Sequence, residues 1–202
     1  MMKIVKFLII TLLLSVSIMG CSMKDMFVRE NKVIDYLSGK VNVLISVKDY
    51  GDIKLELDAD VAPITVTNFV DLVNAKFYDG LTFHRIIGNF MIQGGDPKHN
   101  GTGGSDKEIK GEFKSNGIEN NISHKRGVIS MARSNDKDSA SSQFFIVHQD
   151  STFLDGNYAA FGHVTEGIEV VDKIVQAINP TEEDIEILYE NQPVITSITI
   201  IE

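Results

Sequence analysis

The sequence has few of the residues that cross-link or stiffen a chain. It contains one cysteine, no tryptophan and four prolines among its 202 residues. A single cysteine excludes an internal disulfide and an all-cysteine metal cluster. Basic residues are also scarce, because 19 lysines and arginines stand against 28 acidic residues, and the formal net charge is −9. This balance argues against a nucleic-acid-binding protein, since phosphate binding requires a basic face.

The longest hydrophobic run lies at the N-terminus. Residues 7–19 read FLIITLLLSVSIM and carry no charge. This run is too short for a bilayer core, which needs roughly 20 apolar residues, but it suits a signal peptide. The sequence IMGC at 18–21 resembles a bacterial lipoprotein processing box, although Met19 stands where a small residue is usual. We therefore expect residues 1–20 to be a lipoprotein-type signal peptide and Cys21 to be the lipid attachment site.

These features predict an extracytoplasmic protein that a lipid anchors to a bacterial membrane. A secreted protein or an uncleaved N-terminal anchor is the alternative. Residues 21–40 mix charged and apolar side chains and are interpreted as a tether, with a short helix near 30–37. Regular patterning begins at residue 41, so we expect residues 41–202 to form one domain.

Hydrophobic periodicity in this domain predicts many short strands and two helices. Apolar residues alternate over 41–47 and again over 53–57, which is typical of a half-buried hairpin. Helical spacing follows Pro63, a residue favoured in the first turn of a helix, and recurs over 168–178. We expect a mainly β fold, a closed antiparallel eight-stranded barrel capped by two α-helices. The remaining strand-like runs are 81–86, 90–93, 128–132, 143–147, 159–164 and 194–201.

Two strand segments combine apolar and polar residues in a way that suggests a site. Arg85 lies inside an apolar strand pattern. A guanidinium carries five donors and a permanent charge, so it requires a partner there, and a structural ion pair is the simplest explanation of Arg85 taken alone. Phe144 and Phe145 are adjacent in another strand and must point to opposite faces. One of them can fill the core while the other faces a cleft.

Several segments, in order and spacing, resemble the cyclophilins, the barrel-shaped peptidyl-prolyl cis–trans isomerases. The resemblance covers residues 41–202 and implies an enzyme that rotates X–Pro bonds in exported proteins. It implies proline-containing polypeptides as partners and no cofactor. We also expect no metal, and a monomer by default that meets the membrane through its lipid only. The matching segments are FHRII at 83–87, FMIQGGD at 90–96, HNGTGG at 99–104, GVISMA at 127–132, SQFFI at 142–146, LDG at 154–156 and FG at 161–162.

The resemblance also implies roles for individual residues. Arg85 matches the catalytic arginine, and Gln93 matches the glutamine that places it. An arginine N–H aimed at the imide nitrogen would favour the twisted X–Pro bond, in which resonance is lost and the nitrogen gains a lone pair. The matching substrate-binding residues are Phe90, Met91, Phe145 and Leu154 around the proline ring, Ala132 and Arg133 beside the preceding residue, and Gln143, Phe153 and Tyr158.

The sequence departs from the family pattern at four places. Phe153 replaces a tryptophan whose indole N–H is linked in the family to cyclosporin binding, so we expect weak cyclosporin binding with activity retained. Tyr158 replaces a histidine, and Arg133 replaces an asparagine at a position used mainly through its backbone. Gly88-Asn89 replaces a proline–glycine turn before Phe90, and this replacement changes no catalytic group.

Other interpretations have less support from the sequence. A non-catalytic proline-peptide-binding module, or a holdase-type chaperone, would use the same groove without turnover. His84 adjoins Arg85, but strand alternation predicts that it faces the opposite side as a buried structural residue. The histidines show no ligand spacing, so no metal site is expected. Residues 101–105 lack the end of a P-loop, and Ser142 has no recognisable His–Asp partners.

Overall fold

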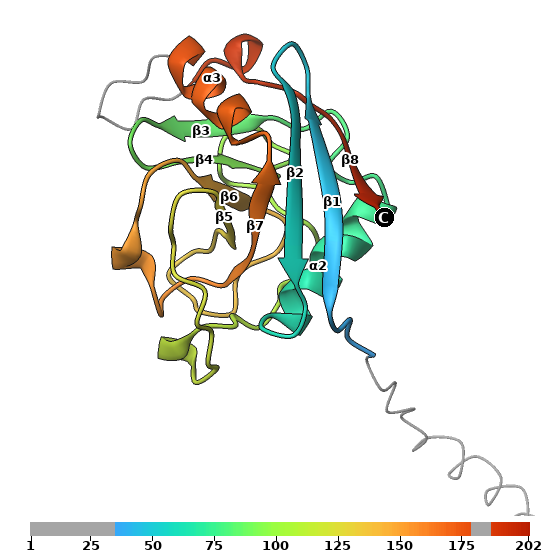
Figure 1. Ribbon diagram of the computed structural model, residues 1–202, viewed down its shortest axis with the longest axis vertical. Helices are drawn as coiled ribbons and strands as arrows, with labels where there is room; N and C mark the ends of the chain where they lie inside the picture. The colour runs from blue at the N-terminus through green and yellow to red at the C-terminus, as the bar shows by residue number, and fades with distance from the viewer. Residues whose placement is uncertain (1–34, 179–186) are drawn as a thin grey trace, which may run out of the picture. The chain divides into compact units, whose positions relative to one another are not determined.

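The computed structural model describes residues 35–178 and 187–202 (Figure 1). Residues 36–202 form one compact unit. The predicted signal peptide, the lipid attachment site Cys21 and most of the predicted tether lie outside the described residues. Among the helices within the described ranges, none is long and apolar enough to cross a membrane.

The fold begins with the predicted hairpin. Strands β1 (Lys40–Val47) and β2 (Gly51–Asp58) pair antiparallel, with Val43 opposite Leu55. The alternating apolar residues of both strands are buried, because successive side chains of a strand point to opposite faces. Strand β8 (Ile195–Ile201) pairs with the other side of β1, so the chain ends beside its first strand.

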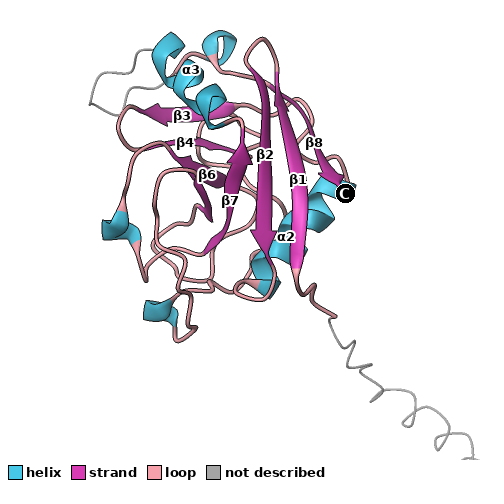
Figure 2. Ribbon diagram, in the orientation of Figure 1, coloured by secondary structure: helices cyan, strands magenta, loops and turns pink. Residues whose placement is uncertain are grey.

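Eight strands form a single antiparallel sheet (Figure 2). The order across the sheet is β3-β4-β6-β5-β7-β2-β1-β8. Figure 1 shows β3 and β4 running across the direction of β1 and β2, so the sheet curves strongly. The remaining strands are β3 (Phe83–Ile87), β4 (Met91–Gly94), β5 (Val128–Met131), β6 (Phe144–Val147) and β7 (Ala160–Glu166).

The prediction of a closed barrel is wrong, because the strand order leaves β3 and β8 as edges of an open half-barrel. Just outside these strands, Thr82 and Val194 form an isolated bridge. The Phe83 N–H donates to the Pro193 carbonyl at 2.9 Å. Proline has no N–H to return a bond, so the pairing does not extend into a ladder at this point.

Two helices pack on the sheet. Helix α2 (Pro63–Asn74) packs against β2 and β8, and α3 (Ile168–Ile178) packs against β2 and β3. Pro63 occupies the first turn of α2, as its sequence predicts. Buried Glu112, from a distant loop, accepts hydrogen bonds from the backbone N–H groups of Ile64 at 3.0 Å and Thr65 at 2.8 Å. A carboxylate is favourable there because the N–H groups at a helix N-terminus lack partners within the helix.

Aromatic rings fill the space between the helices and the sheet. The Phe69 ring of α2 lies 5.0 Å from Tyr78, 5.5 Å from Phe144 and 5.3 Å from Phe161, measured between centroids. All four residues are fully buried. Aromatic pairs at these separations add to the stability that burial provides.

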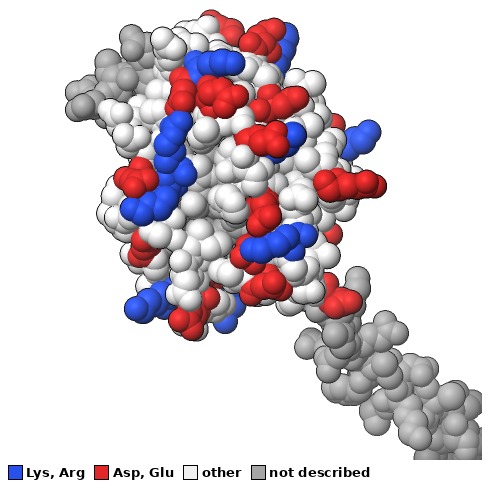
Figure 3. Space-filling model, viewed as in Figure 1, with Lys and Arg blue, Asp and Glu red and all other residues white. Residues whose placement is uncertain are grey.

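Charged residues of both signs mix on the face drawn in Figure 3. Two ion pairs connect neighbouring strands, between Lys40 and Asp58 at 2.5 Å and between Lys54 and Glu166 at 2.7 Å. Each pair joins directly opposite residues in the sheet register. Exposed pairs of this kind contribute at most about 1 kcal/mol each, so they mainly keep this face of the sheet solvated. Three short 3₁₀ turns complete the described structure, η1 (Lys114–Asn116), η2 (Thr152–Leu154) and η3 (Tyr189–Asn191).

Candidate functional site

The structure gathers the predicted site residues around one cleft of about 870 Å³. Gln143 lines the adjoining hollow instead and is hydrogen-bonded to Gln93. The predicted residues that line the cleft are Arg85, Phe90, Met91, Gln93, Ala132, Arg133, Phe145, Phe153, Leu154 and Tyr158. Six further lining residues were not predicted as site residues, namely His84, His99, Asn100, Gly101, Thr102 and Gln192.

Sheet register brings the central polar residue and its neighbours together. Arg85 of β3 lies opposite Gln93 of β4, and Gln93 lies opposite Phe145 of β6. Directly opposite residues project to the same face of an antiparallel sheet. Met91 lies two residues before Gln93 and therefore shares this face. The ladder alone thus places a guanidinium beside apolar side chains.

A chain of hydrogen bonds fixes the orientation of the Arg85 side chain. Its Nη1 donates to Gln93 Oε1 at 3.3 Å. Gln93 Nε2 then donates to Gln143 Oε1 at 2.8 Å, and Gln143 Nε2 donates to the Gly103 carbonyl at 2.6 Å. Each amide uses its oxygen as acceptor and its nitrogen as donor, which assigns both amide orientations. The chain connects β3 to the loop that follows β4.

An apolar pocket lies next to this chain. Met91, Phe145 and Leu154 are at most 8% exposed and belong to a cluster separate from the main core. Ala132 and Tyr158 are half-buried against the same cluster. Phe144 is buried in the main core while Phe145 lines the cleft, which confirms the prediction for the two adjacent phenylalanines. The pocket can hold an apolar ring away from water.

Arg133 uses its side chain to hold one side of the cleft. Its Nε and Nη2 donate to the Asn157 carbonyl at 3.0 and 2.9 Å, and its Nη1 donates to the Ser134 carbonyl at 2.8 Å. The guanidinium carbon lies 4.7 Å from the centre of the Tyr158 ring. It also lies 5.2 Å from the centre of the Phe113 ring. The family pattern predicts that position 133 acts mainly through its backbone. The Arg133 side chain in addition holds the 157–158 loop in place.

The prediction that His84 faces away from Arg85 is wrong. His84 is buried as predicted, but it lines the same cleft. The register of β3 against β4 shifts between Phe83 and Arg85, so His84 occupies a β-bulge. A bulge adds a residue to one strand and breaks the alternation of faces. Burial lowers the pKa of His84, and the nearby Asp96 charge opposes that effect.

The other unpredicted residues differ in how well the sequence marks them. His99, Asn100, Gly101 and Thr102 belong to the HNGTGG segment, so the motif itself could have identified this loop. Gln192 comes from the distant segment before β8, and no local pattern marks it. Across the described ranges, no group of three or more His, Cys, Asp or Glu side chains is placed to hold a metal ion.

Comparisons with known proteins find relatives for most of the chain. Residues 42–200 match the family model described as "Cyclophilin type peptidyl-prolyl cis-trans isomerase/CLD". The chain is 47% identical over 135 residues to peptidyl-prolyl cis-trans isomerase A of Dickeya dadantii, across 62% of this chain and 67% of that protein. It is 46% identical over 123 residues to peptidyl-prolyl cis-trans isomerase B of Bacillus subtilis, across 61% of this chain and 82% of that protein.

Solved structures give the same result. The crystal structure of a Cryptosporidium parvum cyclophilin type peptidyl-prolyl cis-trans isomerase matches with a TM-score of 0.71 and 28% identity. The match covers 81% of this chain and 99% of that one. The structure of the same protein in the presence of the dipeptide Ala-Pro matches with a TM-score of 0.70 and 29% identity, across 80% of this chain and 99% of that one.

Proposed function

The chain belongs to the cyclophilin-type peptidyl-prolyl cis–trans isomerases, and on this premise we propose that Arg85 accelerates rotation about X–Pro bonds held in the cleft. The observation that carries the proposal is the position of Arg85. Its guanidinium lines the same cleft as the buried apolar pocket of Met91, Phe145 and Leu154. A proline ring in that pocket would bring its imide nitrogen within reach of a charged donor.

The chemistry requires no nucleophile and no proton transfer. An X–Pro bond isomerises over tens to hundreds of seconds because its C–N bond has partial double-bond character. Twisting the bond removes that resonance and leaves a lone pair on nitrogen. A donor aimed at the lone pair binds the twisted state more tightly than either planar state, which is the condition for catalysis.

Each part of the cleft has a task in this mechanism. Arg85 supplies the N–H, and Gln93 holds the guanidinium through the 3.3 Å hydrogen bond. The apolar pocket grips the proline ring and excludes water, which strengthens the interaction with the charge. A rate gain of about 10⁵ requires about 7 kcal/mol of preferential binding to the twisted state. A charged donor in a dry site, together with restriction of the flanking chain, can supply an effect of that order.

The test is the cis–trans exchange rate of a short X–Pro peptide, measured by NMR with the full chain in detergent. We expect the wild type to accelerate exchange, and Arg85→Ala to lose about 10²- to 10³-fold in rate while peptide affinity changes less. Arg126→Ala is the matched control, because Arg126 pairs with Asp172 outside the cleft. Equal loss of rate and affinity in Arg85→Ala would contradict the mechanism. Peptide binding without acceleration by the wild type would indicate a proline-peptide-binding module instead.

We also propose that the enzyme acts on exported proteins from a lipid anchor at Cys21. The support is the uncharged run at 7–19 and the lipoprotein-like sequence IMGC at 18–21, which contains the chain's single cysteine. Fractionation of bacteria that express the full chain tests the anchor. We expect the wild type in the membrane fraction and Cys21→Ser largely in the soluble fraction. A membrane-bound Cys21→Ser variant would exclude lipid attachment as the anchor.

A further inference from the structure

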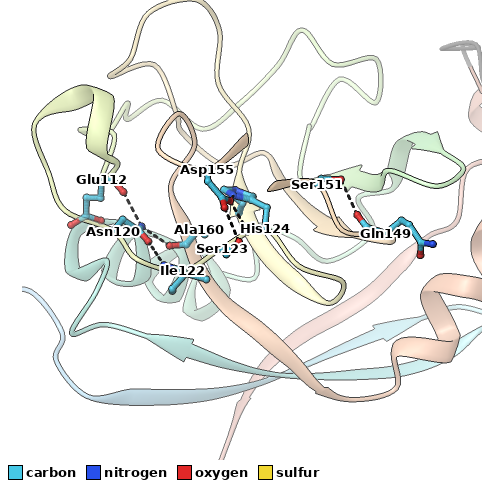
Figure 4. Close-up of polar contacts among 10 residues, drawn as sticks. Glu112, Asn120, Ile122, Ser123, His124, Gln149, Ser151, Asp155 and Ala160 are labelled. Carbon is cyan, nitrogen blue, oxygen red and sulfur yellow. Dashed lines mark hydrogen bonds and ion pairs between the residues drawn. The ribbon is translucent and has the colours of Figure 1, made fainter. Parts of the chain in front are cut away.

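His124 is a buried histidine that the proposed mechanism does not use. It is 1% exposed and follows Ser123, ahead of β5. Its Nδ1 lies 2.9 Å from Asp155 Oδ1 (Figure 4), and its Nε2 lies 3.0 Å from Ser130 Oγ. Asp155 also accepts hydrogen bonds from the His124 backbone N–H at 2.8 Å and from Ser123 Oγ at 2.7 Å. The imidazole is therefore held at both nitrogens.

The order Asp155–His124–Ser130 matches that of a hydrolase triad, but burial excludes that chemistry. Ser130 has no exposed surface, so no substrate can reach its hydroxyl. The partners instead assign the tautomer of the imidazole. The Asp155 carboxylate can only accept, so Nδ1 carries the proton, and Nε2 accepts from the Ser130 hydroxyl. The three residues form a fixed hydrogen-bonded support inside the protein.

This support touches three of the segments that form the apolar pocket, β5, β6 and the 154–158 loop. The His124 ring stacks on Phe145 of β6, with centroids 6.0 Å apart and planes 16° apart. It meets the Tyr158 ring edge-on at 6.5 Å. Asp155 directly follows Leu154, a pocket residue, and Ser130 lies two residues before Ala132. A single imidazole thus connects β5, β6 and the 154–158 loop at the base of the pocket.

We propose that neutral His124 is a positioning residue that holds Phe145, Leu154 and Tyr158 in the geometry required to grip a proline ring. This inference rests on the proposed function of the same cleft. A protonated imidazole would donate from both nitrogens, so the Ser130 hydroxyl would have to turn and accept from Nε2, and its own buried O–H would lose its acceptor. The base of the pocket would then rearrange, and isomerase activity would fall as His124 gains its proton.

The surroundings of His124 set the direction of this pH response. Burial lowers the pKa of His124, and the hydrogen bond and charge of Asp155 oppose that effect. Two residues of the loop after η2 face the imidazole, the Asp155 carboxylate and the Tyr158 phenol ring. Ser130 faces it from β5, and Phe145 faces it from β6. His124 is therefore neutral at neutral pH and gains its proton below its ordinary value of 6.5.

The experiment measures exchange of an X–Pro peptide by NMR from pH 7.5 down to the lowest pH at which circular dichroism shows the chain to be folded. We expect the wild-type rate to fall in a single step below pH 6.5, with Phe145 and Tyr158 ring signals that shift at the same midpoint. His124→Gln should lose about tenfold in rate at pH 7.5, an effect typical of a small misplacement of catalytic groups, and should show no step. The exposed residue His163 provides the matched control, and His163→Gln should retain the wild-type rate and step.

Two further variants separate the alternatives. His84 is the second buried histidine and, unlike His124, lines the cleft, so His84→Gln should retain the pH step whatever its own rate. Ser130→Ala removes only the hydroxyl donor and should lower the rate at pH 7.5 by less than His124→Gln does. This variant keeps the proposal testable if His124→Gln fails to fold. A wild-type rate without a step, or a step that persists in His124→Gln, would overturn the proposal.

The same spectra distinguish failure of this inference from failure of the proposed function. If the wild type never accelerates exchange, the isomerase mechanism fails, and the affinity for the peptide then tests the pocket alone. Weaker peptide binding by His124→Gln at pH 7.5 would still support the positioning role. Unchanged binding would overturn it.

Discussion

The cleft has two walls that are held in different ways. The strand wall consists of Arg85, Met91, Gln93 and Phe145, from β3, β4 and β6. Continuous backbone ladders align these residues, and Met91 and Phe145 are almost fully buried. The loop wall consists of Ala132, Arg133, Phe153, Leu154 and Tyr158, which lie outside the strands. Side-chain contacts to loop backbone hold much of this wall.

The difference separates two requirements of the proposed mechanism. A donor aimed at one nitrogen must be placed to within a fraction of an ångström, and a sheet supplies that precision. A binding wall tolerates more movement, because its contacts are mostly apolar and non-directional. Phe153 illustrates the tolerance: it is 71% exposed and rests on the Phe90 ring at 5.5 Å. We therefore expect changes in the strand wall to affect turnover, and changes in the loop wall to affect binding.

Apart from Arg85→Ala, the largest effect should come from Gln93→Leu in the strand wall. The substitution removes one acceptor of Arg85 and the donor to Gln143, so the guanidinium is held less firmly in its orientation. Misplacement of a catalytic group by about 1 Å can cost about 10²-fold, so we expect kcat to fall between about 10- and 100-fold. The free energy of unfolding should fall by about 1–3 kcal/mol, because half-buried Gln93 loses one neutral hydrogen bond, to Gln143, and one with the charged Arg85 guanidinium.

Peptide exchange rates and urea unfolding of the same samples measure both quantities. Gln149→Leu is the control, since Gln149 is exposed and lies outside the cleft. A rise in KM with unchanged kcat would show that Gln93 serves binding rather than orientation of Arg85.

An intermediate effect should come from Arg133→Lys in the loop wall. Lysine keeps the charge but loses the planar guanidinium that reaches the Asn157 carbonyl with two donors and covers the Tyr158 ring. Loss of a contact worth about 1 kcal/mol corresponds to about a fivefold weaker affinity for a proline peptide. We expect kcat to change less than about twofold, because Arg85 keeps its ladder and its Gln93 partner.

Peptide titration by NMR gives the affinity, and exchange spectra give kcat. Arg126→Lys is a matched control, because Arg126 also combines a carbonyl contact, to His148, with an ion pair, to Asp172, away from the cleft. If Arg133→Lys lowers kcat as much as Gln93→Leu does, the proposed division between the two walls is incorrect.

The same division explains what the sequence could predict. Alternation and helical spacing located every strand to within about two residues, and the family resemblance located ten cleft-lining residues, seven of them inside the motif segments. The open sheet edge could not be predicted, because it depends on how the 193–195 segment meets the 81–83 segment. His84 was misplaced because a bulge leaves no mark in an alternating pattern. The Arg133 clamp and the His124 support were missed because their partners lie 24 and 31 residues away along the chain.

The smallest effect on turnover should come from Phe153→Trp at the edge of the loop wall. Phe153 is mostly exposed and touches no group of the Arg85–Gln93–Gln143 chain, so peptide turnover should change less than about twofold. The wild type should bind cyclosporin weakly, because a phenylalanine ring offers no N–H. An added indole donor worth about 0.5–1.5 kcal/mol should raise that affinity by about 2- to 12-fold.

Fluorescence titration measures this affinity directly, because the wild-type chain contains no tryptophan and the introduced indole is the sole one. Tyr36→Trp is the control, since Tyr36 is an exposed aromatic residue outside the cleft and its substitution should leave cyclosporin affinity unchanged. If Phe153→Trp alters turnover as strongly as Gln93→Leu does, the loop wall helps to place the X–Pro bond in its twisted geometry. An unchanged turnover with stronger cyclosporin binding would show that this wall selects ligands while the strand wall carries out the rotation.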